Sequence, residues 1–264
     1  MYLPVPSQPD CAAAWREGLR AVLGAGGHAS NVILDIEDPI AGNTLADPVV
    51  GAVDAYLQSR NVKPLSTVAN TLFPEALYRR YGAPDVYDRF MSRVLPAAAK
   101  EERWSGYYFE RMINLRTARG GSVNQLADII SRIADPKVKA LNKFEFTIFD
   151  PTRDVDRSPY GGQCLSHGSF KLRKTKSGVV LDLTATYRNH FYVEKLLGNL
   201  IGLGRLMSFV ASESGIQIGA LTIVSTHALA DLPKNAAGRT ATKTEIRQLL
   251  ERCDALASPQ TLAA

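Results

Sequence analysis

The chain has few cysteines and no long apolar run. Its three cysteines, Cys11, Cys164 and Cys253, lie far apart in 264 residues, without a Cys-x-x-Cys pair or a Cys/His spacing of the zinc type. We therefore expect neither structural disulfides nor a bound metal. No apolar stretch is long enough to cross a bilayer, and the proline-rich start has no signal-peptide core. These absences predict a protein of the reducing cytoplasm that does not contact membranes.

Dense tracts of like charge are also missing. The net charge is +5 and the pI is about 9.1, yet the lysines and arginines are scattered along the chain. This pattern does not favour nucleic-acid binding, whereas a phosphorylated small molecule would suit the same charge. With 45% hydrophobic and 22% charged residues, the chain has the composition of a globular protein with a substantial core.

Apolar periodicity and turn residues predict both helices and strands. Helices are expected at 10–23, 49–59, 66–73, 78–94 with a break at 82–84, 123–133, 192–210 and 242–255. Strands are expected at 32–36, 144–148, 168–173, 179–186 and 218–224. Because the two kinds of element do not alternate strictly, we predict one α+β domain over residues 1–264, with the ordered sheet in its second half. A subdomain junction near Gly120 is a weaker alternative.

One thiol stands out by its position. Cys164 lies between a Gly-Gly loop and a predicted strand, where a side chain can be presented at the wall of a cleft. A cysteine is a nucleophile only as a thiolate, and a nearby cation such as Arg188, at the end of the following strand, favours that form. The fork of donors on Arg188 also suits a phosphate or a carboxylate. A buried, inert cysteine and a solvated arginine are the alternatives.

Several polar residues after Arg188 have two interpretations each. Asn199 is predicted to lie on the buried side of a helix, where its amide bonds either a neighbouring strand or a ring with a donor beside an acceptor, such as uracil. His227 follows a strand and either contacts a ligand or stabilises a turn. Tyr108 either lines a pocket or packs in the core. The glycines around Asn199 allow either a ligand or another helix to approach closely.

The order of these residues resembles the thymidylate synthase superfamily, which includes pyrimidine nucleotide hydroxymethylases. The resemblance rests on Cys164, Tyr187-Arg188-Asn189, Asn199 and the stretch Ser225-Thr226-His227-Ala228-Leu229. It covers a core of about 105–230 and is strongest from Cys164 onward. Residues 1–100 diverge, and a C-terminal helix at 242–255 follows the core.

The resemblance implies a thymidylate-synthase-like fold, with a twisted mixed sheet flanked by helices and a homodimer formed across one sheet face. It implies a pyrimidine nucleoside monophosphate as substrate and 5,10-methylenetetrahydrofolate as one-carbon donor. Cys164 would add to C6 of the ring, which is covalent catalysis. The implied substrate-binding residues are Arg188 for phosphate, Asn199 for the base, His227 for the sugar, and Lys143, Tyr108 and Ser225.

The sequence also departs from the pattern of this family. Gln163 replaces the proline before the nucleophile, Leu165 the following histidine, and Leu229 the tyrosine of the sugar motif. Phe191 stands where an aspartate contacts the folate, so we assign no cofactor-binding residues. We therefore expect a divergent transferase of methyl or hydroxymethyl groups. The alternative is a silent pyrimidine-nucleotide-binding homologue that does not use folate.

Overall fold

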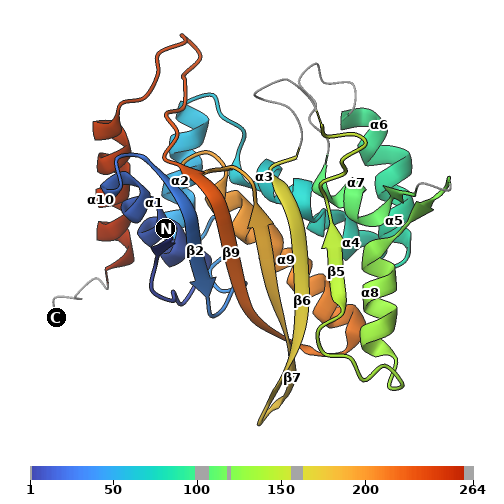
Figure 1. The fold of residues 1–264 in the computed structure, drawn as a ribbon. Coiled ribbons are helices and arrows are strands. Elements are labelled where there is room, and N and C mark those ends of the chain that lie inside the picture. The colour runs from blue at the N-terminus through green and yellow to red at the C-terminus, as the bar shows by residue number, and fades with distance from the viewer. Residues whose placement is uncertain (1, 99–106, 118–119, 156–162, 259–264) are drawn as a thin grey trace.

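The computed structural model describes residues 2–98, 107–117, 120–155 and 163–258. The described residues form a mixed α+β fold, in which helices pack against a mixed sheet (Figure 1). The sheet has seven strands within these ranges, in the order β1-β2-β9-β7-β6-β5, with β8 added beside β9. The predicted α+β class and the mixed sheet flanked by helices are therefore confirmed.

The elements have the following bounds. The strands of the sheet are β1 (Leu3–Pro4), β2 (His28–Ile36), β5 (Phe144–Thr147), β6 (Leu165–Thr175), β7 (Gly178–Tyr187), β8 (His190–Phe191) and β9 (Gln217–Leu229), and a separate pair consists of β3 (Leu115–Arg116) and β4 (Ser122–Val123). The helices are α1 (Cys11–Gly24), α2 (Pro48–Ser59), α3 (Leu65–Leu72), α4 (Glu75–Tyr81), α5 (Asp85–Arg89), a π-helical turn at Phe90–Val94, α6 (Leu95–Ala98), α7 (Tyr108–Ile113), α8 (Gln125–Ala134), α9 (Leu196–Ser214) and α10 (Lys243–Ala257).

A β7–α9–β9 unit lies at the centre of the fold. β7 and β9 are parallel neighbours joined by α9, while β6 forms a hairpin with β7, and β2 pairs antiparallel with β9. α9 is buried along most of its length because it packs against both the sheet and α3. Residues far apart in the sequence therefore meet at the sheet end where β7 stops.

The two faces of the sheet differ in character. Within 181–187 of β7 and 221–225 of β9 every second side chain is buried, and Figure 1 shows helices behind the sheet. The alternate positions include Thr184, Thr186 and Thr222, which are half-buried. Figure 1 shows no helix of the described ranges over this second face. The sheet thus keeps an open face that carries threonines and the half-buried apolar side chains of Ile33 and Val224, with charged ones such as Lys171 and Asp35 beside them.

Both predicted ends of α9 are wrong, and at its C-terminal end the helix continues beyond residue 210 to Ser214. The helix begins at Leu196 and not at Tyr192, because Tyr192 N–H donates to Leu229 O at 2.8 Å. The next two amides, of Val193 and Glu194, donate to the carboxylate of Asp231 at 2.8 and 3.2 Å. These contacts hold the segment against the end of β9, so its apolar residues are buried without being helical.

Other boundaries also move. β9 continues to Leu229, since it pairs with β2 as far as His28, and His227 therefore lies within a strand and not after it. β6 and β7 are longer than predicted, which leaves only residues 176–177 between them. α3 begins at Leu65, one residue before the predicted start, and its N-cap is Pro64. Thr242 and Glu245, which stand at capping-box spacing in the sequence, form a capping box at the start of α10.

The glycines of α9 serve helix packing. A Cβ atom on Gly198 would lie 2.7 Å from the Cβ of Val68, and one on Gly202 would lie 2.8 Å from the carbonyl oxygen of Ala69. Both contacts are with α3, so the glycines let the two helix backbones approach closely. Of the two alternatives left open by the sequence, the structure favours helix packing over approach of a ligand.

Candidate functional site

Cys164 lies at the sheet end, directly before β6. Arg188 N–H donates to Cys164 O at 2.9 Å, and Leu165 is paired with Tyr187, so the thiol is next to the end of β7. Cys164 is half-buried. Burial raises the pKa of its thiol, and the charges of Arg188 and Lys195 oppose that effect. The resting thiol is therefore protonated, but two cations are close enough to favour its thiolate.

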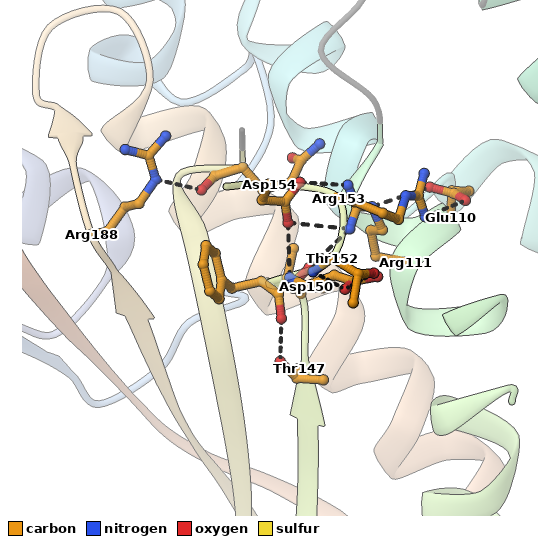
Figure 2. Close-up of polar contacts among 11 residues, drawn as sticks. Glu110, Arg111, Thr147, Asp150, Thr152, Arg153, Asp154 and Arg188 are labelled. Atoms are coloured by element: carbon orange, nitrogen blue, oxygen red, sulfur yellow. Dashed lines mark hydrogen bonds and ion pairs between the residues drawn. The ribbon is translucent and has the colours of Figure 1, made fainter. Parts of the chain in front are cut away.

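Arg188 is exposed and held by the backbone next to Cys164. Its Nε donates to Gln163 O at 2.8 Å. Figure 2 shows its guanidinium group apart from those of Arg111 and Arg153. Thr226 Oγ1 donates to Arg188 O at 3.1 Å, which ties the end of β7 to β9. A charged group that is both exposed and anchored in this way is suited to bind an anion.

A buried ionic cluster supports the loop after β5 (Figure 2). Arg111 of α7 donates to both carboxylate oxygens of Asp154, at 2.8 and 3.2 Å, and Asp154 also accepts from Asp150 N–H at 2.8 Å. Thr152 donates twice to the Asp150 carboxylate, at 2.7 and 2.9 Å. These contacts fix the path of the chain as it leaves β5 toward the segment that precedes Cys164.

Two tyrosines lie beside Cys164. Burial raises the pKa of Tyr108, whose hydroxyl lies beside backbone groups of Leu165 and Cys164. Tyr187 contacts Tyr108 edge to face, with ring centroids 6.5 Å apart. The Tyr187 hydroxyl is buried and has no hydrogen-bond partner among the described residues. Burial raises its pKa well above the usual value, with smaller effects from Tyr108 and Cys164.

A buried polar network lies behind Cys164 and contains Asn199. The Nδ2 atom of Asn199 is 3.0 Å from Nε2 of His190, and Nδ1 of His190 is 3.1 Å from Oγ of Ser225. Tyr192 O–H donates to the same Ser225 oxygen at 3.2 Å. The His190 ring stacks on Tyr187 with centroids 4.0 Å apart. Asn199 is buried, as predicted. Ser225 is buried too, and both side chains lie within hydrogen-bond distance of His190.

The remaining predicted residues lie at different distances from the thiol. His227 is exposed, and its Nδ1 is 2.7 Å from Oδ1 of Asn189, the residue after Arg188. Lys143 directly precedes β5. Thr147, at the other end of β5, pairs with His167, which follows Cys164 closely in the chain. The fold thus brings His227 to the sheet end of Arg188 and leaves Lys143 at the other end of the sheet.

Sequence reasoning missed three residues of this site. Tyr187 belongs to the Tyr187-Arg188-Asn189 motif, but no role was predicted for its hydroxyl, which is buried and has no partner among the described residues. His190 lies in the two-residue strand β8, which is too short for a periodic signal. Lys195 precedes α9, and its charge acts on Cys164 only because the chain turns between β8 and α9. The Tyr-Arg-Asn-His order was the only local signal for His190.

Comparisons with known proteins give no relative: no family model matches the chain, and a search of curated proteins finds no match. Within the described ranges, no helix combines the length and apolar character needed to cross a membrane. The same ranges contain no group of three or more His, Cys, Asp or Glu side chains that could hold a metal ion. The candidate chemistry therefore depends on the residues of the site alone.

Proposed function

We propose that the protein is a divergent thymidylate-synthase-like transferase that adds a methyl or hydroxymethyl group to C5 of a pyrimidine nucleoside monophosphate. The proposal is supported mainly by one observation. A partly accessible thiol, Cys164, lies beside an exposed arginine, Arg188, that is anchored to the backbone carbonyls of Gln163 and Cys164. This pairing combines a nucleophile with a group that binds phosphate.

The covalent step uses the electron pair of the Cys164 thiolate. The Sγ atom adds to C6 of the ring, and the electrons of the C5–C6 double bond move toward C5 and the C4 carbonyl oxygen. C5 then becomes a carbon nucleophile that attacks the one-carbon group of its donor, and the donor leaves with the electron pair of its own bond to that carbon. Loss of the C5 proton and departure of Sγ from C6 restore the ring. Without a donor, C5 takes a proton from water and loses its original hydrogen before Sγ leaves, so this hydrogen exchanges with water and no second substrate is needed.

The charges around the thiol support an anionic substrate. Arg188 and Lys195 both act on Cys164, and a phosphate held between such cations would place the ring near Sγ. Because burial raises the pKa of this thiol, the thiolate fraction grows as pH increases. The rate should therefore rise with pH through the neutral and mildly alkaline range.

The residues present do not fit a folate site of the usual kind. Phe191 occupies the position at which the resemblance expects a carboxylate, and its apolar, half-buried ring cannot accept a hydrogen bond from a pterin. We therefore assign no residues to 5,10-methylenetetrahydrofolate and derive no step through it. The tritium-release assay, run with and without 5,10-methylenetetrahydrofolate, tests whether this folate takes part.

The open sheet face supports a homodimer as part of the same proposal. It carries threonines such as Thr184 and Thr222 together with Val224, which are half-buried in one protomer and are not covered by a described helix (Figure 1). Sedimentation should show a dimer for the wild type and a monomer for Thr184→Arg. The matched control is Ser208→Arg, on an exposed position of α9, which should remain dimeric. A monomeric wild type would contradict the dimer.

Tritium release tests the enzyme activity. The purified protein is incubated with UMP, dUMP, CMP and dCMP labelled at C5, with and without 5,10-methylenetetrahydrofolate. We expect release with one of these nucleotides, loss of release in Cys164→Ser, and retention in Cys253→Ala, which alters a buried cysteine of α10. Release that persists in Cys164→Ser would refute covalent catalysis by this residue.

A second function is a pyrimidine-nucleotide-binding homologue without catalysis or folate. The raised pKa of Cys164 favours it, because a protonated thiol is a weak nucleophile. In that case calorimetry would detect a nucleotide whose binding is weakened by Arg188→Gln, while no tritium is released at any pH. Cys164→Ser would then leave the affinity unchanged.

A further inference from the structure

The carboxylate of Asp231 is buried against backbone amides. Its Oδ1 atom accepts from Val193 N–H at 2.8 Å, and its Oδ2 atom accepts from Glu194 N–H at 3.2 Å. The residue is 9% exposed, and none of the described lysines, arginines or histidines forms an ion pair with it. A carboxylate that leaves water without a cation partner is costly to ionise. Burial raises the pKa of Asp231 from 3.8 to about 7, and the charge of Glu194 adds a smaller effect in the same direction.

The described groups around Asp231 do not balance its charge. Glu194 faces it from the segment before α9, and Tyr56 faces it from α2. Burial raises the pKa of Tyr56, to which the charge of Asp231 adds a smaller effect. The charged groups on the adjoining elements are bonded to other atoms or exposed, namely Arg60, which pairs with Glu245, Lys243, which donates to Gly26 O, and the exposed His28. Ionisation of Asp231 therefore places a second negative charge beside Glu194.

The two amides belong to residues 192–195, which we call the strap. The strap joins β8 to α9 as a turn. Its backbone also donates from Tyr192 to Leu229 O at 2.8 Å and from Lys195 to Phe191 O at 3.1 Å. Burial raises the pKa of Cys164, and the charge of Lys195, the last residue of the strap, is one of the two that oppose this effect. The order of the strap therefore decides where one cation of the site lies.

Opening of the strap changes the proton affinity of Asp231. In the open form the carboxylate meets water, so its pKa returns toward 3.8. Between about pH 3.8 and pH 7 the closed form then binds more protons than the open form, and a rise in pH favours opening. Above pH 7 the carboxylate is ionised in both forms, so the effect reaches a plateau.

We propose that the strap and Asp231 form a pH-sensitive switch: ionisation of the buried carboxylate favours opening of residues 192–195, and acidification closes them with Lys195 held in the site. The driving force for opening is the repulsion between Asp231 and Glu194, together with the hydration that the carboxylate regains. This inference concerns the resting protein and goes beyond the proposed function, because it requires neither a nucleotide nor catalysis.

Hydrogen exchange followed by NMR measures the opening. The exchange rates of the Val193 and Glu194 amides, divided by those of an unstructured chain, give the opening constant at each pH. In the wild type we expect this constant to rise by up to about 50-fold from pH 5 to pH 7, and by only about 2-fold from pH 7 to pH 9. The amide of Leu203, in the middle of α9, is the internal reference and should change far less.

Three variants identify the group responsible. Asp231→Asn carries no charge, so its opening constant should not depend on pH, although the loss of one amide bond should raise the constant at pH 5. Glu194→Gln keeps Asp231 but removes the like charge, so the rise should be smaller and should end at a lower pH. Glu251→Gln removes an exposed carboxylate of α10 and should keep the wild-type profile.

The outcomes are decided by the strap amides. A wild-type opening constant that stays unchanged between pH 5 and pH 7 would overturn the inference. A rise that persists in Asp231→Asn, or an equal rise at Leu203, would also overturn it, because the opening would then not depend on this carboxylate or would not be confined to the strap. If Asp231→Asn does not fold, identical profiles of the wild type and Glu194→Gln contradict the inference. Since no nucleotide is present, the tritium assay can fail while the switch is confirmed, and the reverse.

Discussion

Replacement of His190 should remove an acid-sensitive part of the stability. The pKa of this buried imidazole is lowered by burial from 6.5 to about 3. In the unfolded chain the imidazole takes up a proton as pH falls below 6.5, whereas in the folded protein it stays neutral until about pH 3. Between these values the unfolded state binds more protons, so the free energy of unfolding decreases as pH falls.

The size of the effect follows from the two pKa values. Their difference corresponds to about 5 kcal/mol if the whole window is crossed, and to at most about 1.4 kcal/mol for each pH unit. From pH 6.5 to pH 5 the wild type should thus lose about 2 kcal/mol that a variant without this imidazole does not lose. Well above pH 6.5 the imidazole is neutral in both states, so the contribution is fully present and does not change with pH.

Urea unfolding followed by circular dichroism at several values between pH 8 and pH 5 measures this loss. His190→Phe should be less stable than the wild type at pH 7, because Asn199 and Ser225 lose their partner, but its free energy of unfolding should fall less steeply with pH. Subtraction of the two curves removes other titrating groups, such as Asp231, whose pKa burial raises to about 7. The exposed His28, replaced by Gln, is the control and should keep the wild-type slope. Parallel curves for the wild type and His190→Phe would refute a neutral, buried His190.

Three further substitutions test the packing around the site by urea unfolding at pH 7. Arg111→Met should lower the free energy of unfolding by about 3–5 kcal/mol, because it leaves the buried carboxylate of Asp154 unpaired. The double variant with Asp154→Leu should recover most of that loss. If the two effects simply add, the pair is not coupled. Tyr187→Phe should leave stability unchanged or raise it by up to about 1 kcal/mol, since the hydroxyl has no partner among the described residues, and a clear loss would reveal one. Gly202→Ala should destabilise by about 1–3 kcal/mol, because its Cβ would meet a carbonyl of α3 at 2.8 Å, whereas Gly24→Ala, with open space around it, should be neutral or stabilising.

Local signals in the sequence located most of the elements but misplaced the start of α9. The capping box of α10 could be predicted from Thr242 and Glu245 alone, since both partners lie within one helical turn. The start of α9 could not, because Tyr192 and Val193 are as apolar as the helix that follows. Their amides bond Leu229 and Asp231, which are nearly forty residues away, and no periodicity reports such a contact.

The candidate site was likewise only partly predictable from the sequence. The burial of Asn199 followed from its leucine neighbours on the helix, and the structure confirms it. Its partner His190 could not be found, because the chain must first turn between β8 and α9 to bring the two side chains together. The charge of Lys195 near Cys164 depends on that same turn. Pattern reasoning thus identifies which side chains are buried or charged, and the contacts between them follow only from the tertiary fold.

The β7–α9–β9 unit explains why the polar residues of the site keep a fixed arrangement. Arg188 follows β7, Asn199 lies in the first turn of α9, and Ser225 and His227 belong to β9. One crossover therefore sets their relative positions, and the glycine contacts of α9 with α3 hold that crossover in place. Cys164 joins the unit through the β6–β7 hairpin, whose register places its carbonyl on the Arg188 amide. The thiol thus meets its cation through backbone pairing, whereas the Asn199 amide is oriented by buried side chains, and the two halves of the site can be perturbed separately.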